Sequence, residues 1–194
     1  ISEHLRELDS TARHLWVTEP ATNNSVANST MIPRNSLNYF YRLLTSDLIF
    51  SNDILGKHLI KGRGTYVQCW HGMPLKAIGH DEPHPRYDAS AHFRRMDRDV
   101  KKWDILLSSS SECSAIFRRA FQYSGSILET GLPRNDVLSQ DKDHKVRNSV
   151  RSRLGLLPSD TVALYAPTWR DDSQDPDGAF VQPDLPNLEN IHEE

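Results

Sequence analysis

Residues 65–76 read TYVQCWHGMPLK, an apolar run that leads directly into a turn with a histidine, a glycine and a lysine. Short apolar runs of this kind, almost continuous in apolar character, are typical of parallel strands buried on both faces. Five further runs resemble it: LWVT (15–18), DLIFS (47–51), DILLS (104–108), SILET (126–130) and VALYA (162–166). The sequence therefore predicts up to six strands of a parallel sheet.

Helical patterns separate these predicted strands. Candidates cover 36–45, 90–102 and 143–154, and another follows Ser109, which forms an S-x-x-E capping box with Glu112. Strands that alternate with helices indicate an α/β fold with a Rossmann-like, doubly wound parallel sheet.

Size and charge limit the classes of function. The chain has 194 residues, 37% hydrophobic and 25% charged, which suits one domain and part of a second. The formal net charge of -3 gives no global basic field, so we expect no nucleic-acid partner. We expect a first domain over 1–166, and over 167–194 a proline-rich linker or the start of another domain. Because the chain opens with Ile1, we also expect a fragment.

Three loops that carry functional groups begin where predicted strands end. WHGMP follows 65–69, GLPRND follows 126–130 and PTWRDD follows 162–166. Open α/β sheets bind ligands beyond the carboxyl ends of their strands. We therefore expect one edge of the sheet to gather these loops into a binding site.

The first loop offers acid–base chemistry. It contains His71, and an imidazole could accept a proton from an attacking hydroxyl group. Gly72 lets the backbone approach a ligand, Pro74 stiffens the turn, and Lys76 adds a charge suited to phosphate. An alternative interpretation is a histidine that ends a strand beside a structural tryptophan, Trp70.

The second and third loops offer phosphate contacts. Arg134 could hold a phosphate with two hydrogen bonds, and Asn135 or Asp136 could orient the phosphate or a sugar hydroxyl. The same residues also fit a plain helix start after Pro133. Arg170 in the third loop fits a ligand contact, a surface ion pair or a crossing into a second domain.

Two other groups of polar residues have competing interpretations. His80, Asp81, Glu82 and His84 are metal-ligand types, but their polar, proline-containing context favours a solvated loop, and we predict no metal site. The segment FRRMDRDVKKW (93–103) reads as a core-facing stripe with a solvated basic face, or as a contact for anionic lipid headgroups.

Together these motifs resemble a known family. WHGMPLK (70–76), KKWDILLSSSSECSAIFRRAF (101–121), ETGLPRND (129–136) and LYAPTWRDD (164–172) occur in the order found in CDP-glycerol glycerophosphotransferases of teichoic acid and capsule synthesis. The resemblance runs from about residue 36 to 172 and covers most of the chain.

The resemblance implies the first, acceptor-side domain of a GT-B fold, truncated at both ends, with a second domain holding most of the nucleotide. It implies transfer of glycerol phosphate from CDP-glycerol to the terminal hydroxyl of a polymer on a lipid carrier, at the cytoplasmic face of the membrane, with no cofactor besides this donor. His71 maps to the catalytic histidine of the family. The turn of Trp70, Gly72, Met73 and Pro74 maps to the donor-binding cleft, as does Arg134.

Three alternatives stay open at this point. The donor could be CDP-ribitol, the chain could be a non-catalytic acceptor- or membrane-binding module, or the fold could serve a nucleotide-sugar epimerase or glycosyltransferase. A homo-oligomer is compatible with each of these.

Overall fold

The computed structural model describes residues 1–19, 26–55, 60–83 and 89–166. The chain divides into two compact units, Ile1–Lys142 and Asp143–Glu194, each described by itself below. The domain boundary expected between residues 166 and 167 lies at the end of the described residues, and it stays a prediction.

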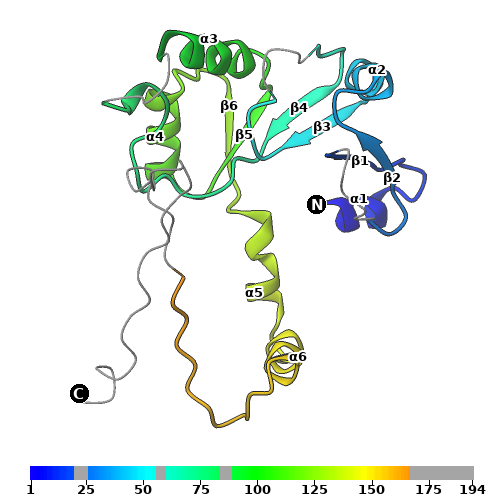
Figure 1. Cartoon of the computed structure of the whole chain (residues 1–194), viewed down its shortest axis with the longest axis vertical. Helices are drawn as coiled ribbons and strands as arrows, with labels where there is room; N and C mark the ends of the chain where they lie inside the picture. Colours follow the sequence, from blue (N-terminus) through cyan, green and yellow to red (C-terminus); the bar gives the residue numbers. More distant parts are fainter. Residues whose placement is uncertain (20–25, 56–59, 84–88, 167–194) are drawn as a thin grey trace, which may run out of the picture. The chain divides into compact units, whose positions relative to one another are not determined.

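A four-stranded parallel sheet forms the centre of the first unit. It contains β3 (Leu48–Ser51), β4 (Thr65–Gln68), β5 (Ile105–Ser108) and β6 (Ser126–Glu129), hydrogen-bonded in that order (Figure 1). These strands confirm four of the predicted runs and the predicted α/β class. Since all four run in the same direction, their carboxyl ends meet at one edge of the sheet.

Aromatic side chains fill the core beside this sheet. Helix α4 (Ser111–Ala120) contacts β5 and β6, and it contributes the fully buried Phe117. Helix α3 (Ala89–Val100) presents its predicted apolar stripe to the same core cluster, together with Trp103. The basic side chains of α3 therefore lie on its exposed face.

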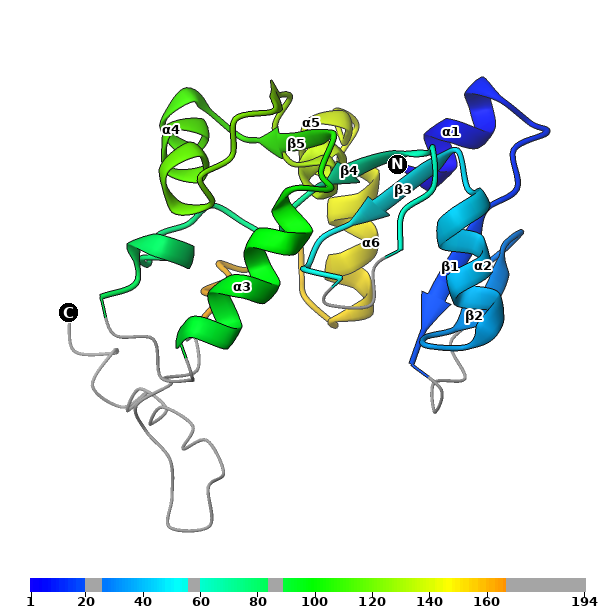
Figure 2. The ribbon, with the colours of Figure 1, turned by 90° about the horizontal axis from the view of Figure 1, so that it is seen from above.

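A smaller sheet precedes the central one. Strands β1 (Leu15–Thr18) and β2 (Thr30–Pro33) pair in parallel, helix α2 (Leu37–Thr45) contacts β2, and α1 (Ser2–Leu8) begins the chain (Figure 2). β1 confirms the strand predicted at 15–18, although it belongs to this separate sheet, and α2 confirms the helix predicted at 36–45. β2 was not predicted because only Met31 and Ile32 of its four residues are strongly apolar and it ends in a proline, which is usual only at strand ends and edges.

The N-terminal cap of α4 corrects one prediction by a single residue. Ser110, not Ser109, is the cap: its backbone is extended and its side chain accepts a hydrogen bond from the amide of Cys113 at 3.2 Å. The helix starts at Ser111, so Ser109 lies one residue too early to reach an open amide group of the first turn.

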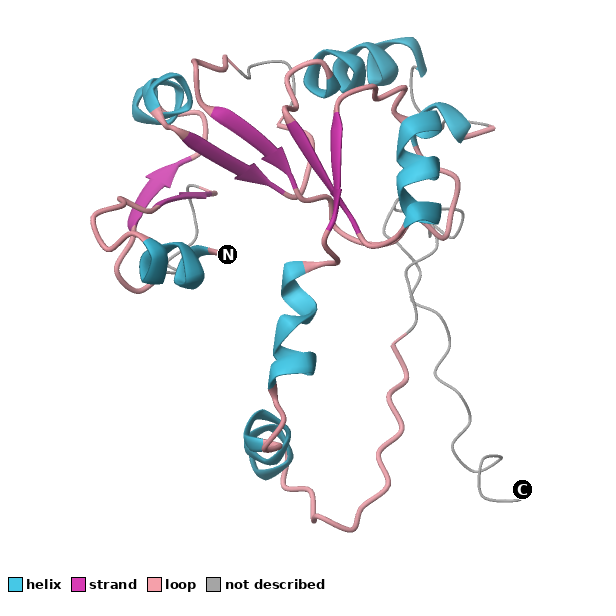
Figure 3. Cartoon of the chain, turned by 180° about the vertical axis from the view of Figure 1, so that it is seen from behind, coloured by secondary structure: helices cyan, strands magenta, loops and turns pink. Residues whose placement is uncertain are grey.

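The second unit lacks a predicted strand. Helix α6 (Lys145–Arg153) confirms the pattern over 143–154, but residues 161–166 form an exposed loop (Figure 3). The apolar run 162–166 has no strand to pair with in the described part of this unit. Leu164 is 88% exposed, so the prediction of a sixth sheet strand there was wrong. In the described residues, no helix has the length and apolar character needed to cross a membrane.

Candidate functional site

The loop after β4 holds His71 against a partly buried tryptophan. The amide of Cys69 donates to the carbonyl of Ser51 at 2.7 Å and extends the strand pairing by one residue. Trp70 then adopts a left-handed backbone conformation with φ of 51°. Its ring stacks on the imidazole of His71 with centroids 4.3 Å apart and meets the ring of Phe121 edge-on at 4.7 Å. Trp70 is therefore a core contact and a support for His71 at once.

His71 itself is exposed to solvent. Among the residues that the structure describes, none hydrogen-bonds to its imidazole. Both ring nitrogens are consequently available to a ligand, as proton transfer requires.

Arg134 joins the loop after β6 to the loop after β4. Its Nη1 donates to the carbonyl oxygen of His71 at 2.9 Å. A β-carbon added at Gly72 would lie 3.7 Å from Nη2, so the guanidinium group runs close to the backbone of this turn. The prediction that one sheet edge gathers these two loops is confirmed.

Local geometry explains how Arg134 reaches that position. Gly131 has φ of 82° and donates its amide to the carbonyl of Ser108 at 3.1 Å, which turns the chain sharply after β6. Pro133 then opens the short 3-10 helix η2 (Pro133–Asn135), and α5 (Asp136–Gln140) follows. The helix-start interpretation and the ligand-contact interpretation of this loop are compatible.

The other predicted site residues differ in their placement. Met73 and Lys76 are exposed and Pro74 is half-buried in the irregular segment after His71, while Asn135 and Asp136 are exposed beside Arg134. Arg170 lies outside the described residues. The strand expected before its loop is not formed over 162–166.

Four consecutive serines, Ser108 to Ser111, run from the end of β5 to the start of α4 at the same edge of the sheet. Ser108 ends β5, and its hydroxyl donates to the carbonyl of Ser110 at 2.9 Å. The side chain of Ser114 donates to Glu129 Oε1 at 2.7 Å, which ties α4 to the end of β6. The amino end of α4, with its partial positive charge, consequently lies at the carboxyl edge of the sheet. The four serines directly after an apolar run were the sequence signal that could have predicted this polar group at the site.

Two of the residues weighed as metal ligands, His80 and Asp81, pair with other side chains, while His84 lies outside the described residues. Nε2 of His80 lies 2.8 Å from Asp97 Oδ1, and Arg119 Nε donates to both carboxylate oxygens of Asp81 at 3.0 and 2.8 Å. These pairs tie η1 (Gly79–Asp81) to α3 and α4. In the described part of the chain, no cluster of metal-ligand side chains is found.

The family of this chain is shown by its similarity to known proteins. All residues, 1–194, match the family described as CDP-Glycerol:Poly(glycerophosphate) glycerophosphotransferase. The chain belongs to this family. The fold and the two adjoining loops described above are therefore those of a segment of this family.

Relatives from bacteria agree with this assignment. A teichoic acid poly(glycerol phosphate) polymerase of Bacillus spizizenii is 34% identical over 82% of this chain and 42% of its own length. A protein of the same name from Staphylococcus epidermidis is 32% identical over 100% of this chain and 28% of its own length. The chain thus spans less than half the length of these relatives.

Solved structures resemble this chain closely. The wall teichoic acid polymerase TagF superposes with a TM-score of 0.87 at 31% identity, over 98% of this chain and 48% of that one. A TagF variant with a histidine replaced by asparagine, soaked with CDPG, gives a TM-score of 0.83. This similarity confirms the predicted α/β, GT-B-like fold class.

Proposed function

We propose that the enzyme carrying this sequence transfers glycerol phosphate from CDP-glycerol to the terminal hydroxyl of a teichoic-acid-type or capsular polymer on a lipid carrier. The observation that carries this proposal is the bridge from Arg134 to the carbonyl of His71. It brings a potential general base and a phosphate-binding cation together at the carboxyl edge of a parallel sheet, where such folds bind their ligands. Family membership supplies the chemistry of donor and acceptor.

The proposed mechanism is a direct displacement. Neutral His71 accepts the proton of the acceptor hydroxyl while its oxygen attacks the β-phosphorus of CDP-glycerol. The bond from that phosphorus to the bridging oxygen breaks, and CMP leaves with the electron pair. Arg134 and Lys76 offset the negative charge that grows on the phosphoryl oxygens. The reaction needs no covalent enzyme intermediate and no cofactor besides the donor.

Replacement of His71 tests this mechanism. We expect His71→Ala to lower kcat by about 10²- to 10⁴-fold, the usual contribution of a general base. The matched control is His80→Ala, because His80 pairs with Asp97 and belongs to the contacts that hold η1 and α3 together. CMP release from CDP-glycerol measures both variants. Near-full activity in His71→Ala would remove His71 from the mechanism.

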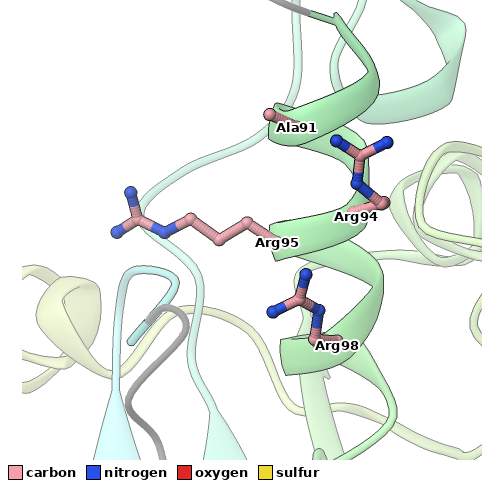
Figure 4. Close-up of a pocket in the computed structure, with 4 residues that line it drawn as sticks. All are labelled: Ala91, Arg94, Arg95 and Arg98. Atoms are coloured by element: carbon pink, nitrogen blue, oxygen red, sulfur yellow. The ribbon is translucent and has the colours of Figure 1, made fainter.

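A basic surface on helix α3 is the second part of the proposal, as a contact for the membrane. Arg94, Arg95 and Arg98 project from the exposed face of α3 and, with Ala91, line a shallow depression of about 300 Å³ (Figure 4). Three guanidinium groups on one face attract anionic headgroups by roughly 1 kcal/mol each near a charged bilayer. We propose that this face makes peripheral contact with the anionic cytoplasmic surface of the membrane, where the lipid-linked acceptor would be found.

The same arginine face favours one alternative, a membrane-binding module without turnover. Flotation with vesicles containing anionic lipid, run beside a CMP-release assay, separates the two. Flotation that is lost in the Arg94→Gln, Arg95→Gln, Arg98→Gln triple variant supports the contact. Flotation without CMP release would favour the module over the transferase, and CDP-ribitol offered in place of CDP-glycerol tests the donor.

A further inference from the structure

Gln68 is a polar residue in a fully buried place. It ends β4 with 0% of its surface exposed, within a strand whose other positions are apolar or half-buried. A buried carboxamide is costly unless its hydrogen bonds are made, so its partners indicate its role. Its Oε1 accepts a hydrogen bond from the amide of Trp70 at 2.8 Å.

The neighbours of Gln68 fix which end of its carboxamide meets Trp70. Its Nε2 lies 3.2 Å from the carbonyl oxygen of Asp53, which can only accept a hydrogen bond. Nε2 also lies 3.4 Å from the hydroxyl of Tyr66, and that hydroxyl donates to Asp99 Oδ2 at 3.3 Å. The NH₂ group must therefore face these acceptors, which leaves Oε1 directed at the amide of Trp70.

This hydrogen bond acts on a residue in an intrinsically unfavourable conformation. Trp70 has a positive φ without being glycine, which a bulky side chain seldom adopts unless its surroundings impose it. Its indole ring carries the stacked imidazole of His71. Any change in the backbone of Trp70 therefore moves both the peptide that leads into His71 and the ring that supports it.

We propose that Gln68 is a positioning residue, whose buried carboxamide holds the left-handed turn at Trp70 and thereby sets the place of the His71 imidazole. The proposal rests on the proposed role of His71 only for its effect on catalysis. The effect on the geometry of the turn is independent of that role.

The test uses Gln68→Met, which keeps the length of the side chain but removes its hydrogen bonds. Stacking on Trp70 shifts the ring-proton NMR signals of His71 upfield, and Trp70→Leu gives their position without the stack. In Gln68→Met we expect these signals to move toward the Trp70→Leu position. In the enzyme carrying this sequence we expect kcat to fall about 10- to 100-fold with little change in KM, as small misplacements of a catalytic group do.

Controls separate positioning from a loss of stability. Tyr123→Phe removes a buried hydroxyl that donates to the carbonyl of Ser126 at 3.2 Å, away from the His71 turn, and should leave both the NMR signals and kcat unchanged. If Gln68→Met fails to fold, Gln68→Asn, which is too short to reach that amide, carries the same expectation.

Unchanged His71 signals in a folded Gln68→Met or Gln68→Asn variant would overturn the proposal. A displaced imidazole with unchanged kcat would instead confirm the positioning and count against His71 as the general base. The positioning role of Gln68 is therefore tested by the His71 NMR signals, and the role of His71 as general base is tested by kcat.

Discussion

Arg134 is the residue whose replacement most directly tests how the two loops cooperate. Arg134→Ala removes the hydrogen bond to the carbonyl of His71 and the positive charge beside it. Arg134→Lys keeps the charge but loses the planar, two-pronged donor that matches a phosphate. The pair of variants therefore separates charge from geometry.

The structure predicts a small effect on stability and a large one on activity. Arg134 is exposed, so its hydrogen bond to a backbone carbonyl contributes about 0.5–1 kcal/mol to the free energy of unfolding. That corresponds to a fall in Tm of about 1–4 °C. A lost charge-assisted hydrogen bond to a phosphoryl oxygen costs about 1.5–3 kcal/mol in the transition state, which lowers kcat/KM roughly 10- to 150-fold.

Arg118 provides the matched control. It is likewise exposed and donates to backbone carbonyls, those of Tyr123 and Gly125 at 3.2 and 3.3 Å, but at the amino end of β6. CMP release and thermal unfolding should be measured for alanine variants of both arginines. We expect similar shifts in Tm, with a loss of kcat/KM only in Arg134→Ala. Equal kcat/KM values for the two variants would refute the phosphate-binding role of Arg134.

Two further predictions concern stability. Ser110→Ala should lower the free energy of unfolding by about 1 kcal/mol in urea denaturation because it removes the cap of α4, whereas Ser109→Ala should have little effect; the reverse order would contradict the cap. Burial raises the pKa of Asp104, but hydrogen bonds from Lys61 and from the amide of Tyr66 outweigh it, and the net pKa is lowered from 3.8. Its carboxylate therefore stabilises the fold above about pH 4, and this stabilisation is lost as the pH falls through the lowered pKa. Unfolding curves between pH 7 and pH 2 should show the deficit of Asp104→Asn shrinking on acidification, and a constant deficit would exclude this linkage.

Local sequence patterns were sufficient for most elements of the first unit. The central strands β4 and β5 appear as apolar runs because they are largely buried, and burial on both faces of a parallel sheet disfavours polar side chains. The edge strands β3 and β6 also keep short apolar runs, although Leu48, Phe50 and Leu128 are partly exposed. Helix α3 was equally readable, since Phe93, Met96 and Val100 recur at helical spacing and do face the core.

Apolar runs gave wrong strand predictions where hydrogen bonding to a neighbouring strand, and not amino-acid composition, decides whether a strand forms. The run 162–166 is as apolar as β5, yet it forms no strand, because in the described residues of its unit no neighbouring strand is present to hydrogen-bond with it. β2 shows the opposite case: its four residues are unremarkable in sequence, but β1 pairs with them along their whole length.

For the candidate site, the sequence by itself determined which functional groups are present and that His71 and Arg134 each follow a strand. It also determined the family, because the motifs keep their types and their order along the chain. Only the tertiary structure decided that Arg134 reaches the backbone of His71, 63 positions earlier in the chain, and that the buried Gln68 hydrogen-bonds to the turn at Trp70. The physical reason is that a parallel sheet brings the ends of its strands together wherever they stand in the sequence, while hydrogen bonds between side chain and backbone depend on that packing.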